Sequence, residues 1–167
     1  MLTKNYFTWL KGCHMWISYY GTDLNGVSKS ITNLALCAEN SGGFHNAMRN
    51  AMAQDYAVSM SGGVWFGSGN KPATIDDYKL ESVLTTGFSV TKPSKISLST
   101  TDEYIEFSAT YGITATADIS ISEIGLFAYD SSTLFMVDRT VLETPIEILK
   151  GKSKQVTYTI RFNYPTA

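Results

Sequence analysis

The sequence predicts a mainly β protein, either an antiparallel β-sandwich or a small barrel, with an N-terminal segment that is partly helical or extended. The prediction rests on two stretches, residues 104–111 and 156–164, in which apolar and polar side chains alternate. An alternation with a period of two is typical of antiparallel strands that bury one face. The faces expected to be buried consist of Ile105, Phe107, Ala109 and Tyr111 in the first stretch and Val156, Tyr158, Ile160, Phe162 and Tyr164 in the second.

Further strands are expected between and before these two. Residues 117–143 read as two strands, because the turn-forming cluster YDSST divides an otherwise apolar stretch. The sequence LKGKSK predicts another turn, in which Gly151 adopts a positive φ. The sequence VWFGSG, residues 64–69, reads as a strand that ends in a glycine-rich turn. The C-terminal two-thirds of the chain would then hold about six or seven strands, a spacing that fits a sandwich or small barrel.

The chain divides by pattern into an N-terminal segment, residues 1–61, and a β-sandwich domain, residues 62–167. Local patterns in the N-terminal segment predict, in order, a short helix, a turn-rich stretch, a strand and a second helix, at residues 2–17, 18–26, 30–39 and 44–60. Both helices are expected from the spacing of apolar residues at three and four positions.

Aromatic side chains gather at the start of the chain, before the β framework begins. Tyr6, Phe7, Trp9 and Trp16 are candidate contacts with other subunits, so the N-terminal segment is expected to act as an assembly arm. This interpretation also accounts for an ordered terminus, which must be tied down by some contact. The alternative is that these aromatic residues fold back onto the chain's own sandwich.

Composition limits the partners that the protein can have. Of the 167 residues, 44% are hydrophobic and 17% charged, and 10 tyrosines and 8 phenylalanines are present. Low charge with many aromatic residues predicts a homo-oligomer or a larger shell, since a lone domain would leave apolar area exposed. The net charge of −2 indicates neither nucleic acid nor an acidic membrane as a partner. No apolar run reaches the roughly 20 residues of a membrane span, and the start lacks the pattern of a secretory signal.

The sequence motifs predict no catalytic residue, no cofactor and no metal, so we do not expect an enzyme. Near Gly67 and Gly69 the spacing of glycines and lysine fits neither a P-loop nor a dinucleotide fingerprint. The adjacent Asp76 and Asp77 lack the further oxygen ligands that calcium needs. Histidine and cysteine residues show no catalytic or zinc-binding spacing, and both cysteines are expected to be free thiols. The stretch from residue 71 to 82 reads as an extended connection across the surface.

The strict alternation of apolar residues breaks at Glu123 and Gly125. Ile121 shares one face with Ile119, whereas Ile124 and its neighbour Leu126 fall on the opposite face. Either a β-bulge shifts the register, or both faces of the strand are covered. The second option would bury Glu123, which would then need a cationic partner. Arg139 on the following strand is the expected partner, in an architectural ion pair.

Five segments resemble, in order and spacing, a pattern found in small β-rich structural proteins of tailed-bacteriophage virions. They are Gly67–Gly69, Asp76–Glu81, Ile121–Phe127, Val137–Val141 and Val156–Phe162. The resemblance implies a head-decoration, neck or tail accessory component, made in the host cytoplasm and located in the virion. Its partners would be capsid, neck or tail subunits, and it would have no catalytic residues and no cofactor. On this interpretation Gly67 and Gly69 let the backbone turn tightly where a loop meets the sheet.

A second function remains open at this point. A β-sandwich at a fibre tip or capsid surface could instead bind a host glycan or receptor through exposed aromatic residues. The candidates for such contacts are Tyr19, Tyr20, Trp65 and Phe66.

Overall fold

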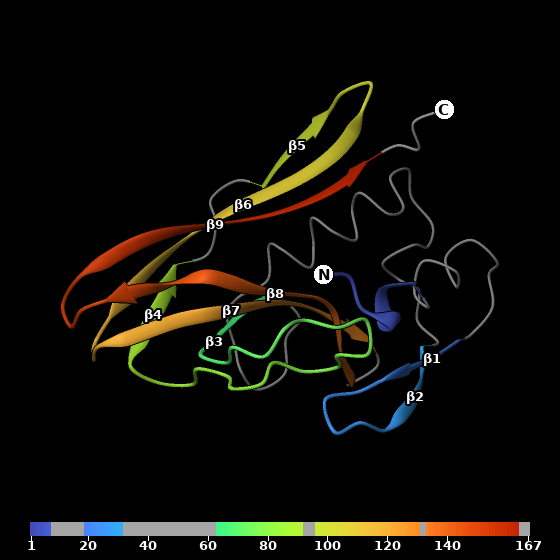
Figure 1. The fold of residues 1–167 in the computed structure, drawn as a ribbon, viewed down its shortest axis with the longest axis horizontal. Coiled ribbons are helices and arrows are strands. Elements are labelled where there is room, and N and C mark those ends of the chain that lie inside the picture. Colours follow the sequence, from blue (N-terminus) through green and yellow to red (C-terminus); the bar gives the residue numbers. More distant parts are fainter. Residues whose placement is uncertain (8–18, 32–62, 92–95, 131–132, 164–167) are drawn as a thin grey trace.

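The structure is a computed structural model, and it describes residues 1–7, 19–31, 63–91, 96–130 and 133–163. Strands dominate the described residues (Figure 1), which confirms the prediction of a mainly β fold. The nine strands are β1 (Tyr19–Thr22), β2 (Ser28–Ile31), β3 (Gly63–Gly67), β4 (Phe88–Thr91), β5 (Ile96–Thr100), β6 (Tyr104–Ala115), β7 (Ile119–Asp130), β8 (Thr133–Ile148) and β9 (Ser153–Asn163).

All strand pairs among these residues are antiparallel, and they form three sheets that do not close into a barrel. One sheet has the order β3-β7-β8, and a two-stranded hairpin joins β1 to β2. In the remaining sheet β9 runs along the full length of β6 on one side. On the other side β4 pairs with residues 112–115 of β6, and β5 pairs with residues 105–109. β4 and β5 therefore lie end to end along one edge of β6.

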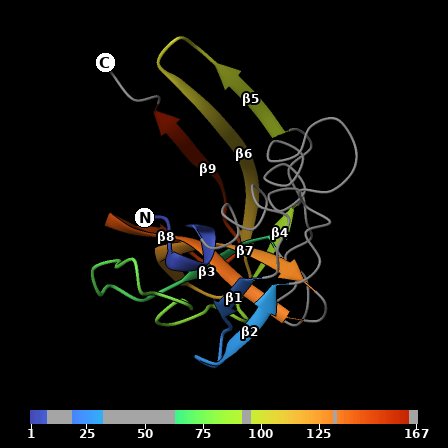
Figure 2. The same ribbon diagram turned by 90° about the vertical axis from the view of Figure 1, so that its right-hand side faces the viewer.

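The core lies between the β3-β7-β8 sheet and the sheet built around β6. Every second residue of β6 and β9 faces this core, which confirms the alternation read from the sequence. Figure 1 shows β6 and β9 above β7 and β8, and Figure 2 shows β5 with its half of β6 projecting beyond the lower sheet. The buried residues of the core include Phe107, Tyr111 and Ile113 from β6, Val156, Tyr158 and Ile160 from β9, and Phe66, Ile121 and Leu126 from the opposite sheet.

Both turns expected between the last three strands are present. β7 and β8 pair as a hairpin, with Asp130 opposite Thr133, and the two residues between them lie outside the described residues. Gly151 connects β8 to β9 with φ of 76°, as its place in the sequence predicts. This positive φ explains the glycine, because a side chain at that backbone conformation is strained.

The first residues of the chain extend the β3-β7-β8 sheet. Leu2 makes a β-bridge with Asp138, and the Thr3 amide donates to the Val137 carbonyl. Tyr6 is only 3% exposed and stacks on Phe162 in the core. The interpretation of Tyr6 as a subunit contact is therefore wrong, since this ring completes the chain's own sandwich. Residues 1–7 pack as part of the β domain.

The remaining predictions for the N-terminal segment have mixed outcomes. Residues 4–7 form one helical turn, and Phe7 is 48% exposed. The stretch read as a turn contains β1, followed by a turn that ends at Gly26 with a positive φ. Trp9, Trp16 and the helix expected at residues 44–60 lie outside the described residues. Among the residues that the structure describes, no helix is long and apolar enough to cross a bilayer.

Tyrosines in the core carry hydroxyl groups away from water. Tyr158 donates a hydrogen bond of 2.7 Å from its hydroxyl to Oδ2 of Asp138, and both side chains are buried. Burial, together with the negative charge of Asp138, raises the pKa of Tyr158 well above its usual value. Burial also raises the pKa of Tyr6 to about 12 and raises the pKa of Tyr111.

These tyrosines predict a loss of stability in alkaline solution. A group whose pKa is higher in the folded than in the unfolded protein stabilises the fold fully below its unfolded pKa, about 10 for tyrosine. That stabilisation is lost as the pH rises toward the folded pKa. We expect the free energy of unfolding, measured with urea, to be level between pH 7 and 9 and to fall above pH 10. Tyr158→Phe should lose stability at pH 7 and show a shallower fall above pH 10; an equal fall in both proteins would contradict the assignment.

Candidate functional site

An irregularity in the pairing of β7 with β8 places Glu123 in the interior. Ile121 lies opposite Ile146, but Glu123 lies opposite Val141, so four residues of β8 face the single residue Ser122. Pro145 is one of these four, and proline, which has no N–H, is typical of such bulges. Every residue from Ile121 to Phe127 is buried. Both alternatives for the broken alternation therefore hold: the register shifts, and both faces are covered.

The Glu123 carboxylate is fully buried and is held by one cation and three backbone amides. Oε2 accepts from Nε of Arg139 at 2.9 Å and lies 2.8 Å from Nη2, which confirms the expected ion pair. The amides of Gly69 and Ser82 donate to Oε1 at 3.1 and 2.7 Å, and the Glu81 amide donates to Oε2 at 3.1 Å. A buried carboxylate needs such donors, because its burial without them costs several kcal/mol.

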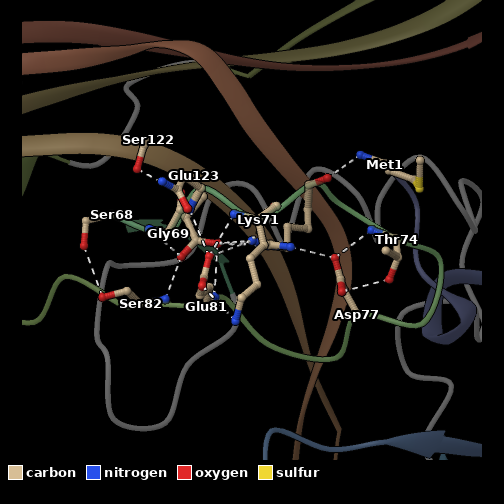
Figure 3. A network of polar contacts seen from close by, with 12 residues as sticks. Met1, Ser68, Gly69, Lys71, Thr74, Asp77, Glu81, Ser82, Ser122 and Glu123 are labelled. Carbon is tan, nitrogen blue, oxygen red and sulfur yellow. Dashed lines mark hydrogen bonds and ion pairs between the residues drawn. The ribbon is translucent and has the colours of Figure 1, made fainter.

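Arg139 extends the network to a segment that lies far away in the sequence, of which Lys71, Thr74 and Asp77 are labelled in Figure 3. Its side chain is 3% exposed, Nη1 donates to Oδ2 of Asp77 at 2.8 Å, and Nη2 donates to the carbonyl of Lys71 at 3.2 Å. Burial alone would lower the pKa of this guanidinium, but hydrogen bonds to Asp77 and Glu123 outweigh it and raise the pKa. Arg139 therefore stays a cation in the folded protein.

The chain from residue 68 to 82, which we call the 68–82 segment, is folded around three carboxylates: those of Asp77, Glu81 and Glu123. Asp77 accepts hydrogen bonds from both the amide and the hydroxyl of Thr74. Glu81 accepts from the amides of Asn70 and Lys71, and its Oε1 lies 3.0 Å from Nζ of Lys71.

These contacts also determine the ionisation of the carboxyl groups of Asp77 and Glu81. Burial opposes ionisation of Asp77, but the Thr74 amide and Arg139 outweigh it and lower its pKa. The hydrogen bond from the Lys71 amide is the main reason that the pKa of Glu81 is lowered. Both groups are thus ionised around neutral pH, opposite the cationic Arg139.

Gly67 and Gly69 are required by the space that Glu123 occupies. A Cβ on Gly67 would lie 2.6 Å from Oε1 of Glu123, and one on Gly69 would lie 2.5 Å from the same atom. Neither of these two glycines is among the described glycines with a positive φ, which include Gly63 and Gly87. The expectation that these two glycines let the backbone turn is therefore wrong: they let the loop backbone approach a buried carboxylate.

Gly125 has a similar role on the outer face of the β3-β7-β8 sheet. A Cβ there would lie 2.9 Å from Cδ2 of Leu80 and from Cε2 of Phe127. Leu80 belongs to the 68–82 segment and packs in a small apolar cluster with Trp65, Phe127 and Met136. The segment is therefore held to the sheet by apolar packing as well as by the ion network.

A depression of about 470 Å³ lies beside the network and is lined by the 68–82 segment and Arg139. Five of its six charged lining residues form ion pairs within the chain: Arg139 with Asp77, Lys71 with Glu81, and Asp76 with Lys4. The sixth, Lys79, has its Nζ 5.6 Å from the centre of the Tyr78 ring. Within the described ranges no group of three or more His, Cys, Asp or Glu residues is placed to hold a metal ion. Most of the charges around the depression are thus neutralised by one another.

The aromatic residues considered for glycan binding are only partly at the surface. Trp65 and Phe66 are 3% and 0% exposed, so they cannot stack on a sugar. Both belong to the core, because β3 is covered on both faces. Tyr20 is 70% exposed, and the side chain of Tyr19 lies outside the described residues.

Sequence reasoning found Glu123, Arg139 and the glycines but missed the partners in the 68–82 segment. Asp77 and Glu81 stand in a polar stretch that looks like an ordinary surface connection. Comparison with known proteins gives no match to a protein-family model, a curated protein or a solved structure. Function is therefore inferred from the geometry and from the sequence pattern described above.

Removal of Arg139 tests the importance of the buried network. We expect Arg139→Ala to lower the free energy of unfolding by about 3–5 kcal/mol, because it leaves Glu123 as a buried charge without a counterion. Arg161→Ala is the matched control: Arg161 pairs with Glu106 at 2.7 Å, but its side chain is 51% exposed, so the loss should be far smaller. Urea unfolding of both variants measures the difference. Equal losses would show that burial does not set the importance of these pairs.

A methyl group at residue 69 tests the close approach of the loop to Glu123. Gly69→Ala should destabilise the protein by about 1–3 kcal/mol, because the new Cβ would overlap the carboxylate and the side chain of Glu81. Gly112→Ala in β6 is the control, since its Cβ would meet Thr91 at an ordinary 3.5 Å. Thermal unfolding should separate the two variants clearly. If both lose the same stability, the space around Glu123 is not the constraint.

Proposed function

We propose that this chain is a structural protein of a tailed-bacteriophage virion, where it binds other virion subunits as a head-decoration, neck or tail accessory component. The observation that supports the proposal most is a convergence in space. Four of the five segments that carry the resemblance, at residues 67–69, 76–81, 121–127 and 137–141, meet at the network around Glu123 and Arg139. The fifth forms most of β9, which packs on the same core.

The convergence favours a structural role, because the residues of these segments hydrogen-bond to one another and pack against one another. Arg139 uses all three of its guanidinium nitrogens on Glu123, Asp77 and the Lys71 carbonyl. The glycines make room for this arrangement, and the apolar residues of β7 fill the core on both sides. A sequence pattern composed of such residues preserves a shape, as a subunit of an assembly requires.

Location in the particle tests the proposal directly. Tailed particles are purified from the bacterium that carries the coding sequence, and the chain is sought by mass spectrometry and by immunogold electron microscopy. We expect the chain in purified particles, with label at one repeated position on the head, neck or tail. The major capsid protein serves as the internal control for recovery. Particles that contain the capsid protein but lack this chain would contradict the proposal.

A further inference from the structure

The two ends of the 68–82 segment are held in part by hydrogen bonds between neutral groups. The Ser68 amide donates to the Ser82 carbonyl at 2.8 Å, and the Ser68 hydroxyl donates to the Ser82 hydroxyl at 3.1 Å. Ser122 of β7 donates from its hydroxyl to the Gly69 carbonyl at 2.9 Å. Amides and hydroxyls do not titrate in acid. These contacts therefore persist at any pH at which the sheet stays folded.

The middle of the segment is attached through charges, and these converge on Arg139. Nη1 of Arg139 lies 2.8 Å from Oδ2 of Asp77. Nη2 lies 2.8 Å from Oε2 of Glu123 and 4.0 Å from Oε2 of Glu81. Carboxylates gain protons in acid. The attachment of the middle of the segment therefore depends on pH, whereas the neutral bonds at its ends do not.

Other charged groups near the segment have partners of their own, away from the guanidinium of Arg139. Among the described residues these pairs are Lys71 with Glu81, Lys4 with Asp76, the Met1 amino group and the Tyr158 hydroxyl with Asp138, and Lys79 with the Tyr78 ring. Asp138 is the neighbour of Arg139 on β8, but its side chain points to the opposite face of the strand. The three carboxylates around Nη1 and Nη2 are therefore the acidic groups that balance the charge of Arg139.

Arg139 makes the closed segment unstable once these carboxylates are neutral. Its guanidinium keeps its charge at every accessible pH, and its side chain is buried beneath the segment. A buried cation without a counterion is strongly destabilising. Opening of the segment would bring the guanidinium into water, while the core on the other face of the β3-β7-β8 sheet stays closed. Acid therefore favours an open segment over complete unfolding.

The side chains beneath the segment include one polar group that opening would stabilise. Trp65 is buried in the same apolar cluster as Leu80 of the segment, and its Nε1 has no hydrogen-bond partner among the residues that the structure describes. A buried donor without an acceptor destabilises the closed form, because it has lost its bonds to water. Opening would move Leu80 away from Trp65 and let water reach the cluster. The contacts of Arg139 therefore have to outweigh this cost while the segment is closed.

The direction of two pKa shifts gives the pH range of the opening. Despite its burial, the pKa of Asp77 is lowered by hydrogen bonds from the Thr74 amide and Arg139. The Lys71 amide is the main cause that lowers the pKa of Glu81. A carboxyl group with a lowered folded pKa stabilises the fold above its unfolded pKa, about 4, and this contribution is lost as the pH falls through the folded pKa. The segment should therefore stay closed at neutral pH and open below about pH 4.

We propose that the 68–82 segment is an acid-sensitive flap, which opens about its two fixed ends at low pH while both sheets stay folded. Opening brings Arg139 into water and uncovers the apolar cluster beneath the flap, which consists of Trp65, Phe127 and Met136. The chain then has two conformations with different outer surfaces, and the pH selects between them. This inference goes beyond the virion proposal and does not depend on it.

Nuclear magnetic resonance of the full, isotopically labelled chain tests the opening in an acid titration. The amides of Asn70, Lys71 and Thr74 are the probes, because each donates to a carboxylate of the segment. We expect their signals to move to the positions of an unstructured chain below about pH 4. The indole signal of Trp65 should shift in the same transition, whereas the signals of β6 and β7 keep their dispersed positions.

Two variants test whether Arg139 causes the transition. Asp77→Asn removes one counterion and should move the midpoint upward by at least about half a pH unit. The double variant Glu123→Gln/Arg139→Met has no buried cation, so its segment should stay closed throughout the titration. Glu106→Gln is the matched control: Glu106 pairs with Arg161 of the other sheet at 2.7 Å, so the midpoint should not change. Circular dichroism verifies the β fold of each variant, and Asp77→Asn alone decides the test if the double variant does not fold.

Three results would overturn the inference. The first is loss of the signals of the segment and of β7 together at one pH, which would show that no separate flap exists. The second is a segment whose signals stay in place down to the lowest pH at which the chain is soluble. The third is an Asp77→Asn variant with the midpoint of the wild type. None of these results bears on the virion proposal, which is tested on purified particles.

Discussion

The fold depends on the buried carboxylate of Glu123, because the surrounding residues must stabilise its charge without water. Glu123 lies in the middle of an apolar strand, and an ionised group in that position is stable only with a counterion and hydrogen-bond donors. Arg139 on the neighbouring strand supplies the charge, and three amides of residues 69–82 supply the remaining donors. The 68–82 segment, which lies outside the strands, thus donates backbone hydrogen bonds to a side chain in the interior of the sheet.

Charged side chains of β8 make contacts on both faces of the strand. Arg139 reaches the 68–82 segment on the outer face, while its neighbour Asp138 reaches Tyr158 of the opposite sheet. Consecutive residues of a strand point to opposite sides, so this pair connects β8 to both covering layers. Asp138 also lies 3.1 Å from the amino group of Met1. The β3-β7-β8 sheet is therefore a middle layer, which explains why Ile121–Phe127 is buried on both faces.

The sequence predicts this fold best where one strand face meets water. β6 and β9 alternate cleanly, because their outward faces are exposed hydroxyl residues. The ion pair was also predictable, since a charge inside an apolar strand requires a counterion close by. The roles of Asp77 and Gly69 were not, because an acidic residue or a glycine in a polar stretch has the same local pattern whether it faces solvent or a buried group. Tyr6 was misread for the same reason: its burial depends on pairing with β8, more than a hundred residues away.

Hydrogen exchange in the native state tests the central claim most directly. The amides of Gly69, Glu81 and Ser82 lie outside the strands but donate to a buried carboxylate. If Glu123 holds the 68–82 segment to the sheet, these amides should exchange as slowly as the amides of β7, through opening of the sheet itself. Exchange at the rate of an unstructured chain, with β7 still protected, would show that the segment opens on its own and would contradict the claim that Glu123 anchors it.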